Sequence, residues 1–147
     1  AANKTLLGGG RVDGAIHRRA GRELLAECRT LGGCETGEAK ITKGYNLKAK
    51  YVIHTVGPIC STQKNQASLL ANCYKNSLDL ALKHDIHSIA FPAISTGVYH
   101  YPLEEATKIA ISTVKTWLDM HKDYKLDIIF SCFDEKTYNM YQRYLEA

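Results

Sequence analysis

The chain has 147 residues, which is enough for one domain with a buried core and too few for two. Hydrophobic residues make up 45% of it and charged residues 23%, ordinary globular values that exclude disordered and fibrous classes. Nineteen Lys and Arg against fifteen Asp and Glu leave a formal net charge of +4 without a dense basic block, which favours anionic ligands weakly.

The cysteines and the hydropathy pattern bear on where the protein works. The five cysteines are odd in number and include no C-x-x-C pair, so neither a disulfide framework nor a zinc site is expected. No apolar run of about 18 residues and no signal segment is present. We therefore expect a cytoplasmic monomer that binds no membrane and requires no metal or cofactor.

The first half of the chain predicts two helices and two strands. Small and apolar residues recur at helical spacing from Val12 to Glu27, with a break at Gly21, and Asp13 is expected to open the first helix. The segments 38–42 and 50–58 are predicted strands. The second is a nearly continuous apolar run, which is typical of a strand buried on both faces of a parallel sheet.

The second half predicts helices alternating with buried strands. A helix is expected over 67–84, a strand over 88–94, a helix with Pro102 as its first residue, a strand over 126–133, and a last helix capped by Asp134. This order predicts one three-layer α/β/α domain with a mixed, mostly parallel central sheet. In such folds ligands bind beyond the carboxyl ends of the strands.

Two glycine-bearing loops each run into a predicted helix, "GGGRVDGAIH" at 8–17 and "STGVYHYP" at 95–102. Helix N-termini offer unpaired N–H groups, and glycine lets those amides approach phosphate oxygens, so the two loops suit a diphosphate. Both loops are equally well explained as tight strand-to-helix connections. Neither matches G-x-G-x-x-G or a P-loop, which disfavours dehydrogenase and ATPase functions.

The polar residues near the first loop are open to two interpretations each. Asp13 can bind a ribose hydroxyl or act as a weak base, or it can simply cap a helix. Asn3 can bind a hydroxyl or position water, or it can form an Asx turn. His17 lies one helical turn beyond Asp13 as an ion-pair partner, and His54 is expected to be a packed strand histidine.

Residues at the ends of the later strands are candidates for packing against a nucleotide. Ser95 and Thr96 have no evident base partner, so we expect local hydrogen bonds from them instead of nucleophilic catalysis. Pro58, Tyr99 and Phe133 could stack on a base or ribose, although core packing is the simpler explanation of Phe133.

Taken together, "AAN", "LLGGG", "VDGAIH", "GEAKIT", "KYVIHTVGP", "SIAFPAISTGVYHYP" and "CFDE" resemble the macrodomain family, in particular its MacroD-type branch. The resemblance covers essentially the whole chain. It implies an ADP-ribose-binding α/β/α fold, hydrolysis of mono-ADP-ribose from acidic side chains of proteins, and deacetylation of O-acetyl-ADP-ribose. Mono-ADP-ribosylated proteins are then the partners.

The resemblance also implies roles for individual residues. Asn3 and Asp13 match the pair on which activity depends, Asn3 positioning ribose and water and Asp13 activating a water or a substrate hydroxyl. Phe133 matches the aromatic residue near adenine. Two loops match those that hold the diphosphate and distal ribose, the first by Gly8, Gly9, Gly10 and Val12, and the second by Ser95, Thr96, Gly97, Val98 and Tyr99.

The chain departs from the family pattern at several positions. Arg11 stands where the family has a fourth glycine, and it could either clamp a phosphate or distort the loop, of which we favour the second. Arg19 stands where alanine is common, and Arg22, Glu35 and Lys48 stand where proline is common. Four of these five changes add positive charge. The family's first strands would precede residue 1, so the single macrodomain over 1–147 is expected to lack them.

Three functions follow from these patterns. The first is a hydrolase of ester-linked mono-ADP-ribose. The second is a non-catalytic ADP-ribose reader, which Arg11 favours. The third is a reader of RNA or poly-ADP-ribose, which rests only on the basic balance and on the base-stacking residues and is disfavoured; a steep fall in affinity with salt would favour it.

Overall fold

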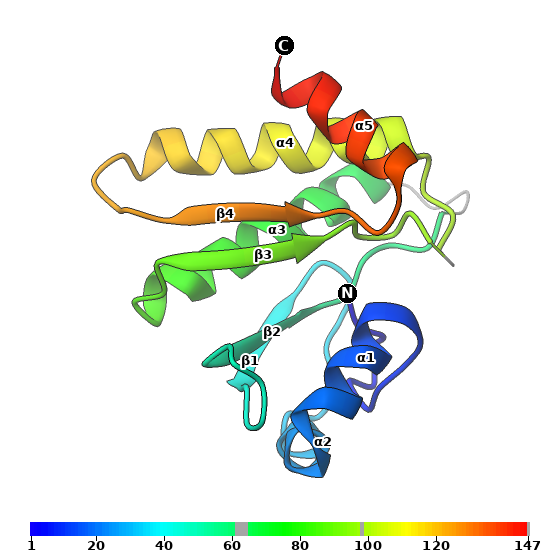
Figure 1. Cartoon of the computed structure of the whole chain (residues 1–147), viewed down its shortest axis with the longest axis vertical. Coiled ribbons are helices and arrows are strands. Elements are labelled where there is room, and N and C mark those ends of the chain that lie inside the picture. The colour runs from blue at the N-terminus through cyan, green and yellow to red at the C-terminus, as the bar shows by residue number, and fades with distance from the viewer. Residues whose placement is uncertain (61–64, 98, 147) are drawn as a thin grey trace.

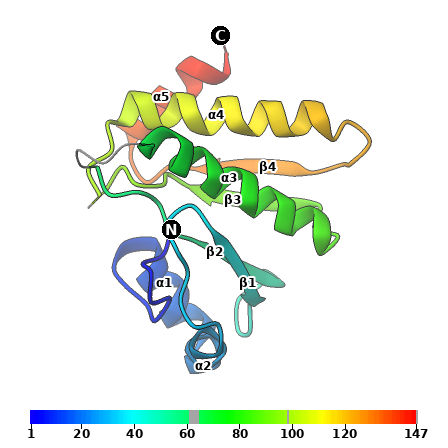
Figure 2. The same cartoon turned by 180° about the vertical axis from the view of Figure 1, so that it is seen from behind.

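A computed structural model describes residues 1–60, 65–97 and 99–146 (Figures 1 and 2). Every predicted helix and strand is present in it. No helix in these ranges is long and apolar enough to cross a membrane. In chain order the elements are α1 (Arg11–Ala20), α2 (Arg22–Thr30), β1 (Ala39–Lys43), β2 (Tyr51–Thr55), α3 (Gln66–Lys83), β3 (Ser88–Pro92), α4 (Leu103–Met120), β4 (Asp127–Ser131) and α5 (Glu135–Leu145).

The helix starts differ from the predictions in two places. Helix α1 begins at Arg11 with Gly10 as its N-cap, so Asp13 lies inside the first turn instead of opening the helix. Pro102 is the N-cap of α4 and not its first residue. The expected cap of α5 is confirmed, because the Asp134 carboxylate accepts a hydrogen bond of 2.9 Å from the Thr137 amide.

The four strands form two separate pairs, β1 with β2 antiparallel and β3 with β4 parallel. On its β1 side, therefore, the segment 50–58 pairs antiparallel and not in parallel as expected. Only the short segment 44–50 joins β1 to β2, whereas a parallel crossover needs a dozen residues or more. Hydrophobicity along β2 indicates that it is buried but carries no information on the direction of its partner.

The β1–β2 pair has helices on both faces. The His54 ring points toward α2, where its Nε2 lies 4.0 Å from Sγ of Cys28. Tyr51 faces the other way and packs on His84 at the end of α3, with ring centroids 5.8 Å apart. Since residues three apart in a strand point to opposite faces, α1–α2 and α3 form the outer layers around this pair.

The β3–β4 pair buries one face under α3, α4 and α5. Phe91 and Phe130 are paired in register; Phe91 packs on Tyr74 of α3 and Phe130 on Tyr141 of α5, with centroids 5.1 and 4.9 Å apart. On the opposite face Ile129 is 59% exposed. The buried apolar residues accordingly form two clusters, one around α3–α5 and the other around α1 and α2.

The strand directions bring the predicted site loops to one end of the molecule. Strands β2, β3 and β4 all run toward the end where the N-terminus and the start of α1 lie (Figure 1). The loops after these strands therefore meet the glycine loop that precedes α1, as expected for ligand binding beyond the carboxyl ends of strands.

Candidate functional site

Three contacts join the loops at this end of the sheet. The Cys60 amide donates to the Tyr99 carbonyl oxygen at 2.7 Å, which ties the loop after β2 to the loop after β3. Gly57 packs so closely on Ser95 that a Cβ atom would overlap Oγ of that serine. A Cβ atom at Gly97 would lie 3.3 Å from Cζ of Arg11, so the first and second glycine loops are also in contact. The loops form one continuous surface.

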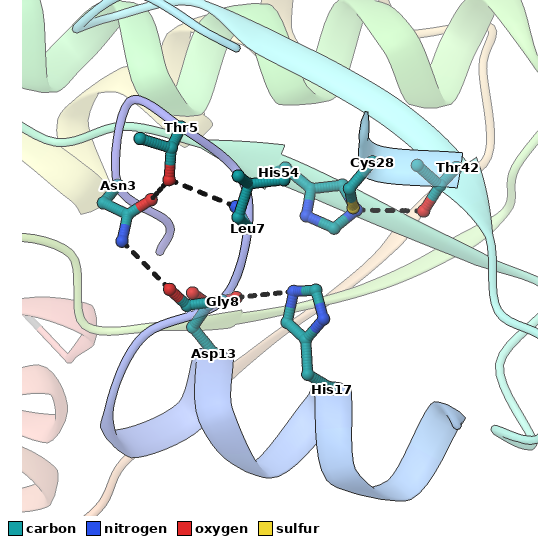
Figure 3. A network of polar contacts seen from close by, with 9 residues as sticks. All are labelled: Asn3, Thr5, Leu7, Gly8, Asp13, His17, Cys28, Thr42 and His54. Carbon is teal, nitrogen blue, oxygen red and sulfur yellow. Dashed lines mark hydrogen bonds and ion pairs between the residues drawn. The ribbon is translucent and has the colours of Figure 1, made fainter. Parts of the chain in front are cut away.

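Asn3 and Asp13 converge on the first glycine loop (Figure 3). A Cβ atom at Gly9 would lie 3.3 Å from Oδ2 of Asp13 and 3.5 Å from Nδ2 of Asn3. Only a glycine leaves the space beside these two groups open. The amide and the carboxylate therefore face the same small volume, one as a donor and the other as an acceptor.

The Asn3 side chain is held by the loop itself. Its Nδ2 donates to the Gly8 carbonyl oxygen at 3.1 Å, and its Oδ1 accepts from the Thr5 hydroxyl at 2.8 Å. The Leu7 amide in turn donates to the Thr5 hydroxyl oxygen at 3.2 Å. These contacts replace the Asx turn that was the alternative for Asn3, because Oδ1 accepts from a hydroxyl and not from a backbone amide. Sequence reasoning missed Thr5, although an N-x-T triplet is a known source of such local bonds.

Asp13 is buried beside His17. Burial raises the pKa of its carboxyl above the ordinary value, and the nearby His17 ring opposes that rise. The predicted pairing has the expected geometry: Nε2 of His17 lies 3.4 Å from Oδ1 of Asp13, which makes an ion pair when the ring is protonated. A carboxylate whose pKa is raised toward neutrality is a better proton acceptor than an exposed one.

Beneath this pair lies His54, which is packed as expected. Its Nε2 lies 2.9 Å from the Thr42 hydroxyl, and its ring centroid lies 6.4 Å from that of His17. Burial lowers the pKa of His54 to about 4. The imidazole is therefore neutral and supports the helix that carries Asp13 without competing for its charge.

Acid is expected to destabilise the fold through His54. Because its folded pKa lies below the unfolded value of 6.5, the unfolded chain takes up the proton first, and stability is lost as pH falls from about 6.5 to about 4. A pKa change of this size is worth roughly 3 kcal/mol. Urea unfolding of the protein and of His54→Gln at pH 7 and pH 5 measures the loss. Equal acid sensitivity in both proteins would assign it to other groups.

The second glycine loop holds a polar group without a partner. Ser95 has a left-handed backbone, with φ +67°, and its carbonyl oxygen accepts from the Tyr101 amide at 2.8 Å. Its buried Oγ has no hydrogen-bond partner among the described residues, so the expected local hydrogen bond is wrong for this side chain. Thr96, Gly97 and Tyr99 are half-buried beside it, and Val98 lies outside the described residues.

Arg11 spans the two glycine loops. It has a positive φ of +54°, which is strained for a residue with a side chain, and its guanidinium lies against Gly97. The hydrogen bond from Thr137 lowers the pKa of Asp134, and the charge of Arg11 lowers it further, so Arg11 also acts on the loop after β4. Arg11 thus contacts the second glycine loop from a position where the family pattern has glycine.

The aromatic and proline candidates are placed differently from one another. Phe133 is 88% exposed at the end of β4, which excludes the core-packing alternative and leaves its ring free to contact a ligand. Pro58 is buried after β2.

The residues of the first glycine loop differ in backbone conformation and exposure. Gly8 has a φ of +96° and Gly10 is exposed, while Val12 is exposed on the first turn of α1. Sequence reasoning missed Gly14, where a Cβ atom would lie 2.5 Å from the Gly9 carbonyl oxygen.

Comparisons of the sequence with known proteins give one family. The "Macro domain" family matches residues 1–110. A macro domain-containing protein of Mesorhizobium japonicum is 57% identical over all of the chain and 84% of its own length. Rat ADP-ribose glycohydrolase MACROD1 is also 57% identical, over 99% of the chain, but the chain spans only 57% of that protein.

Solved structures give the same result. The Trypanosoma brucei macrodomain in complex with ADP-ribose superposes with a TM-score of 0.93 at 48% identity, covering 99% of this chain and 61% of that one. The Oceanobacillus iheyensis macrodomain with ADP gives 0.92 at 44% identity and is covered to 80%. The predicted three-layer α/β/α fold class is confirmed.

Proposed function

The chain belongs to the Macro domain family, and we propose that it binds ADP-ribose and hydrolyses mono-ADP-ribose from acidic side chains of proteins. The observation that carries the proposal is the convergence of Asn3 and Asp13 beside Gly9, where no Cβ atom fills the space. Relatives of 55–57% identity are named ADP-ribose glycohydrolases, which supports a hydrolase over other classes.

Variants of one neighbour support the choice of these two residues. The Oceanobacillus iheyensis macrodomain has been solved with an asparagine and, ten positions later, an aspartate each replaced by alanine. Asn3 and Asp13 are separated by the same ten positions. A third variant, with a valine in place of the glycine three positions before that aspartate, was solved with ADP-ribose, and Gly10 has this spacing from Asp13.

The chemistry that we propose needs only groups of this chain. Asn3 holds a ribose hydroxyl or a water through its amide, and the Asp13 carboxylate accepts a proton from the attacking water or a substrate hydroxyl. Amides of the loops around Gly9 and Gly97 offset the diphosphate charge, and Phe133 and Tyr99 contact adenine and the distal ribose. The unpartnered Ser95 hydroxyl is a further donor for a bound phosphate. Deacetylation of O-acetyl-ADP-ribose, also an ester, is proposed at the same site.

The proposal is tested by calorimetric titration with ADP-ribose and by release of ADP-ribose from a protein modified on glutamate. We expect micromolar or tighter binding together with release. Binding without release would favour the alternative, a non-catalytic reader of ADP-ribose. The position of Arg11 between the two glycine loops supports that alternative. Absence of both would overturn the proposal.

We further propose that residues 1–147 form a single macrodomain whose sheet takes another strand between β2 and β3. Those two strands are not paired with each other, and the Ala2 amide donates to the Thr55 carbonyl oxygen at 2.8 Å. The N-terminus lies at this end of β2 in both views (Figures 1 and 2). Residues preceding Ala1 in a longer protein would run parallel to β2 and β3 and join the two apolar clusters.

The cysteines bear on the cellular location of the protein. The cysteines of the described part are all free thiols, which suits a reducing compartment, and we propose a cytoplasmic monomer. Its partners would be mono-ADP-ribosylated proteins.

A further inference from the structure

Six exposed cationic residues belong to the α1–α2 junction and to the turn between β1 and β2, at the end of the molecule opposite α4 and α5. The turn between β1 and β2 packs there, because the Asn46 amide donates to the Ala20 carbonyl oxygen at 3.2 Å and the Lys43 amide donates to Oε1 of Glu27 at 3.1 Å. Both views show the helices and this turn together (Figures 1 and 2). The residues, here called the basic pole, are Arg18, Arg19, Arg22, Lys43, Lys48 and Lys50.

The charge of the basic pole is not neutralised within the described part of the chain. All six side chains are exposed, and none forms an ion pair there. Two carboxylates lie nearby: Glu27, which accepts from the Lys43 backbone amide at 3.1 Å and from the Tyr45 hydroxyl at 2.6 Å, and the exposed Glu23, so cations still outnumber anions there. Residues 1–60 hold ten Lys and Arg against five Asp and Glu, whereas the rest of the chain holds nine against ten. The net positive charge is thus concentrated in this half.

The basic pole is within reach of the proposed reaction site. Helix α1 carries Asp13 in its first turn and ends at the pole, and its ten residues span about 15 Å. The Arg18 side chain folds back toward the site, with Nη1 3.1 Å from where a Cβ atom of Gly14 would lie. About five residues of extended chain cover the same distance.

We propose that the basic pole binds acidic side chains of the substrate protein that flank its modified residue. This inference rests on the proposed function, which places the modified side chain beside Asp13. The guanidinium group of arginine forms bidentate hydrogen bonds with carboxylates, and three of the six cationic residues are arginine. A single-stranded nucleic acid fits less well, because residues 18–30 contain no aromatic side chain for stacking on bases.

The test uses two peptides that carry mono-ADP-ribose on one central glutamate, flanked by glutamates in one and by glutamines in the other. The variant R18Q/R19Q/R22Q is compared with K115Q/K122Q/K125Q, which removes the same charge from exposed residues of α4 and the segment after it. Affinity and KM are measured at low and physiological salt. We expect the arginine variant to lose about tenfold in affinity for the acidic peptide alone, with kcat unchanged.

Each other outcome overturns the inference. An equal loss with the lysine variant would indicate an effect of net charge, and an equal loss with the glutamine-flanked peptide would indicate damage to the site. A larger loss for a single-stranded RNA oligonucleotide than for the acidic peptide would make nucleic acid the partner. Free ADP-ribose is titrated alongside: if the unaltered protein fails to bind it, the proposed function fails as well, whereas normal binding confines the failure to the basic pole.

Discussion

Asp13→Asn is expected to lower the rate of ADP-ribose release by at least about a hundredfold while changing ADP-ribose affinity by no more than a few fold. General-base groups contribute about 10²–10⁴-fold to rates, and the amide keeps the shape of the carboxylate but cannot accept the proton. Single-turnover release from a glutamate-modified protein and calorimetric titration measure the two effects separately.

The same substitution should stabilise the fold at neutral pH. The folded pKa of Asp13 is raised, so ionisation is harder in the folded protein than in the unfolded chain, and the free energy of unfolding falls as pH rises through the folded pKa. Asparagine removes this penalty, so the gain should appear at pH 7 and vanish at pH 3. Glu23→Gln, an exposed carboxylate on α2, is the matched control and should change neither rate nor stability. Full turnover in Asp13→Asn would place the base elsewhere.

A rise in stability together with a fall in turnover in Asp13→Asn would indicate that Asp13 acts in catalysis and not as a helix cap. A buried carboxylate close to an asparagine amide and a histidine ring is unfavourable for folding and useful for proton transfer. A purely structural cap would behave in the opposite way, because its removal typically costs about 1 kcal/mol of stability. The two measurements together therefore separate the catalytic interpretation of Asp13 from the capping one.

Local patterns in the sequence predicted the elements, because helical stripes and apolar runs are properties of neighbouring residues. The apolar residues at helical spacing from Leu70 to Leu82 lie in α3, and the apolar segment before Gly57 forms β2. The direction in which β2 pairs depends on the length of the 44–50 connection, and the hydrophobicity of the strand does not encode it. Helix α1 starts two residues before Asp13, because the Gly14 amide already donates to the Gly10 carbonyl oxygen.

The site was predictable only in part for a similar reason. Asn3 precedes the first glycine loop and Asp13 follows it in the first turn of α1, so their convergence follows from short-range geometry. Contacts such as Arg11 on Gly97, or Cys60 on Tyr99, join loops from different strands and depend on the sheet that brings them together. The resemblance to macrodomains identified these loops in the sequence. That Arg11, in place of a glycine, packs its guanidinium against Gly97 could be seen only in the structure.

Arg11→Gly is expected to strengthen ADP-ribose binding by about tenfold and to raise the rate of release. The guanidinium lies against Gly97, between the two loops that would hold the diphosphate, and a ligand must displace it. Glycine adopts a φ of +54° without strain, whereas an ordinary residue there loses roughly 1–2 kcal/mol. Calorimetric titration of the two proteins at matched salt measures the affinity, and thermal unfolding measures the relief of strain.

Two further variants separate bulk from charge at this position. Arg11→Asn is short and neutral and tolerates the left-handed backbone, so it should bind ADP-ribose nearly as well as Arg11→Gly. Arg11→Lys keeps a long cation and should bind like the unaltered protein. Weaker binding by both Arg11→Gly and Arg11→Asn, with a shallower dependence on salt, would contradict the displacement argument. The arginine would then be a clamp on the diphosphate, because its charge-assisted hydrogen bonds to phosphate would outweigh the strain of its backbone and the displacement from Gly97.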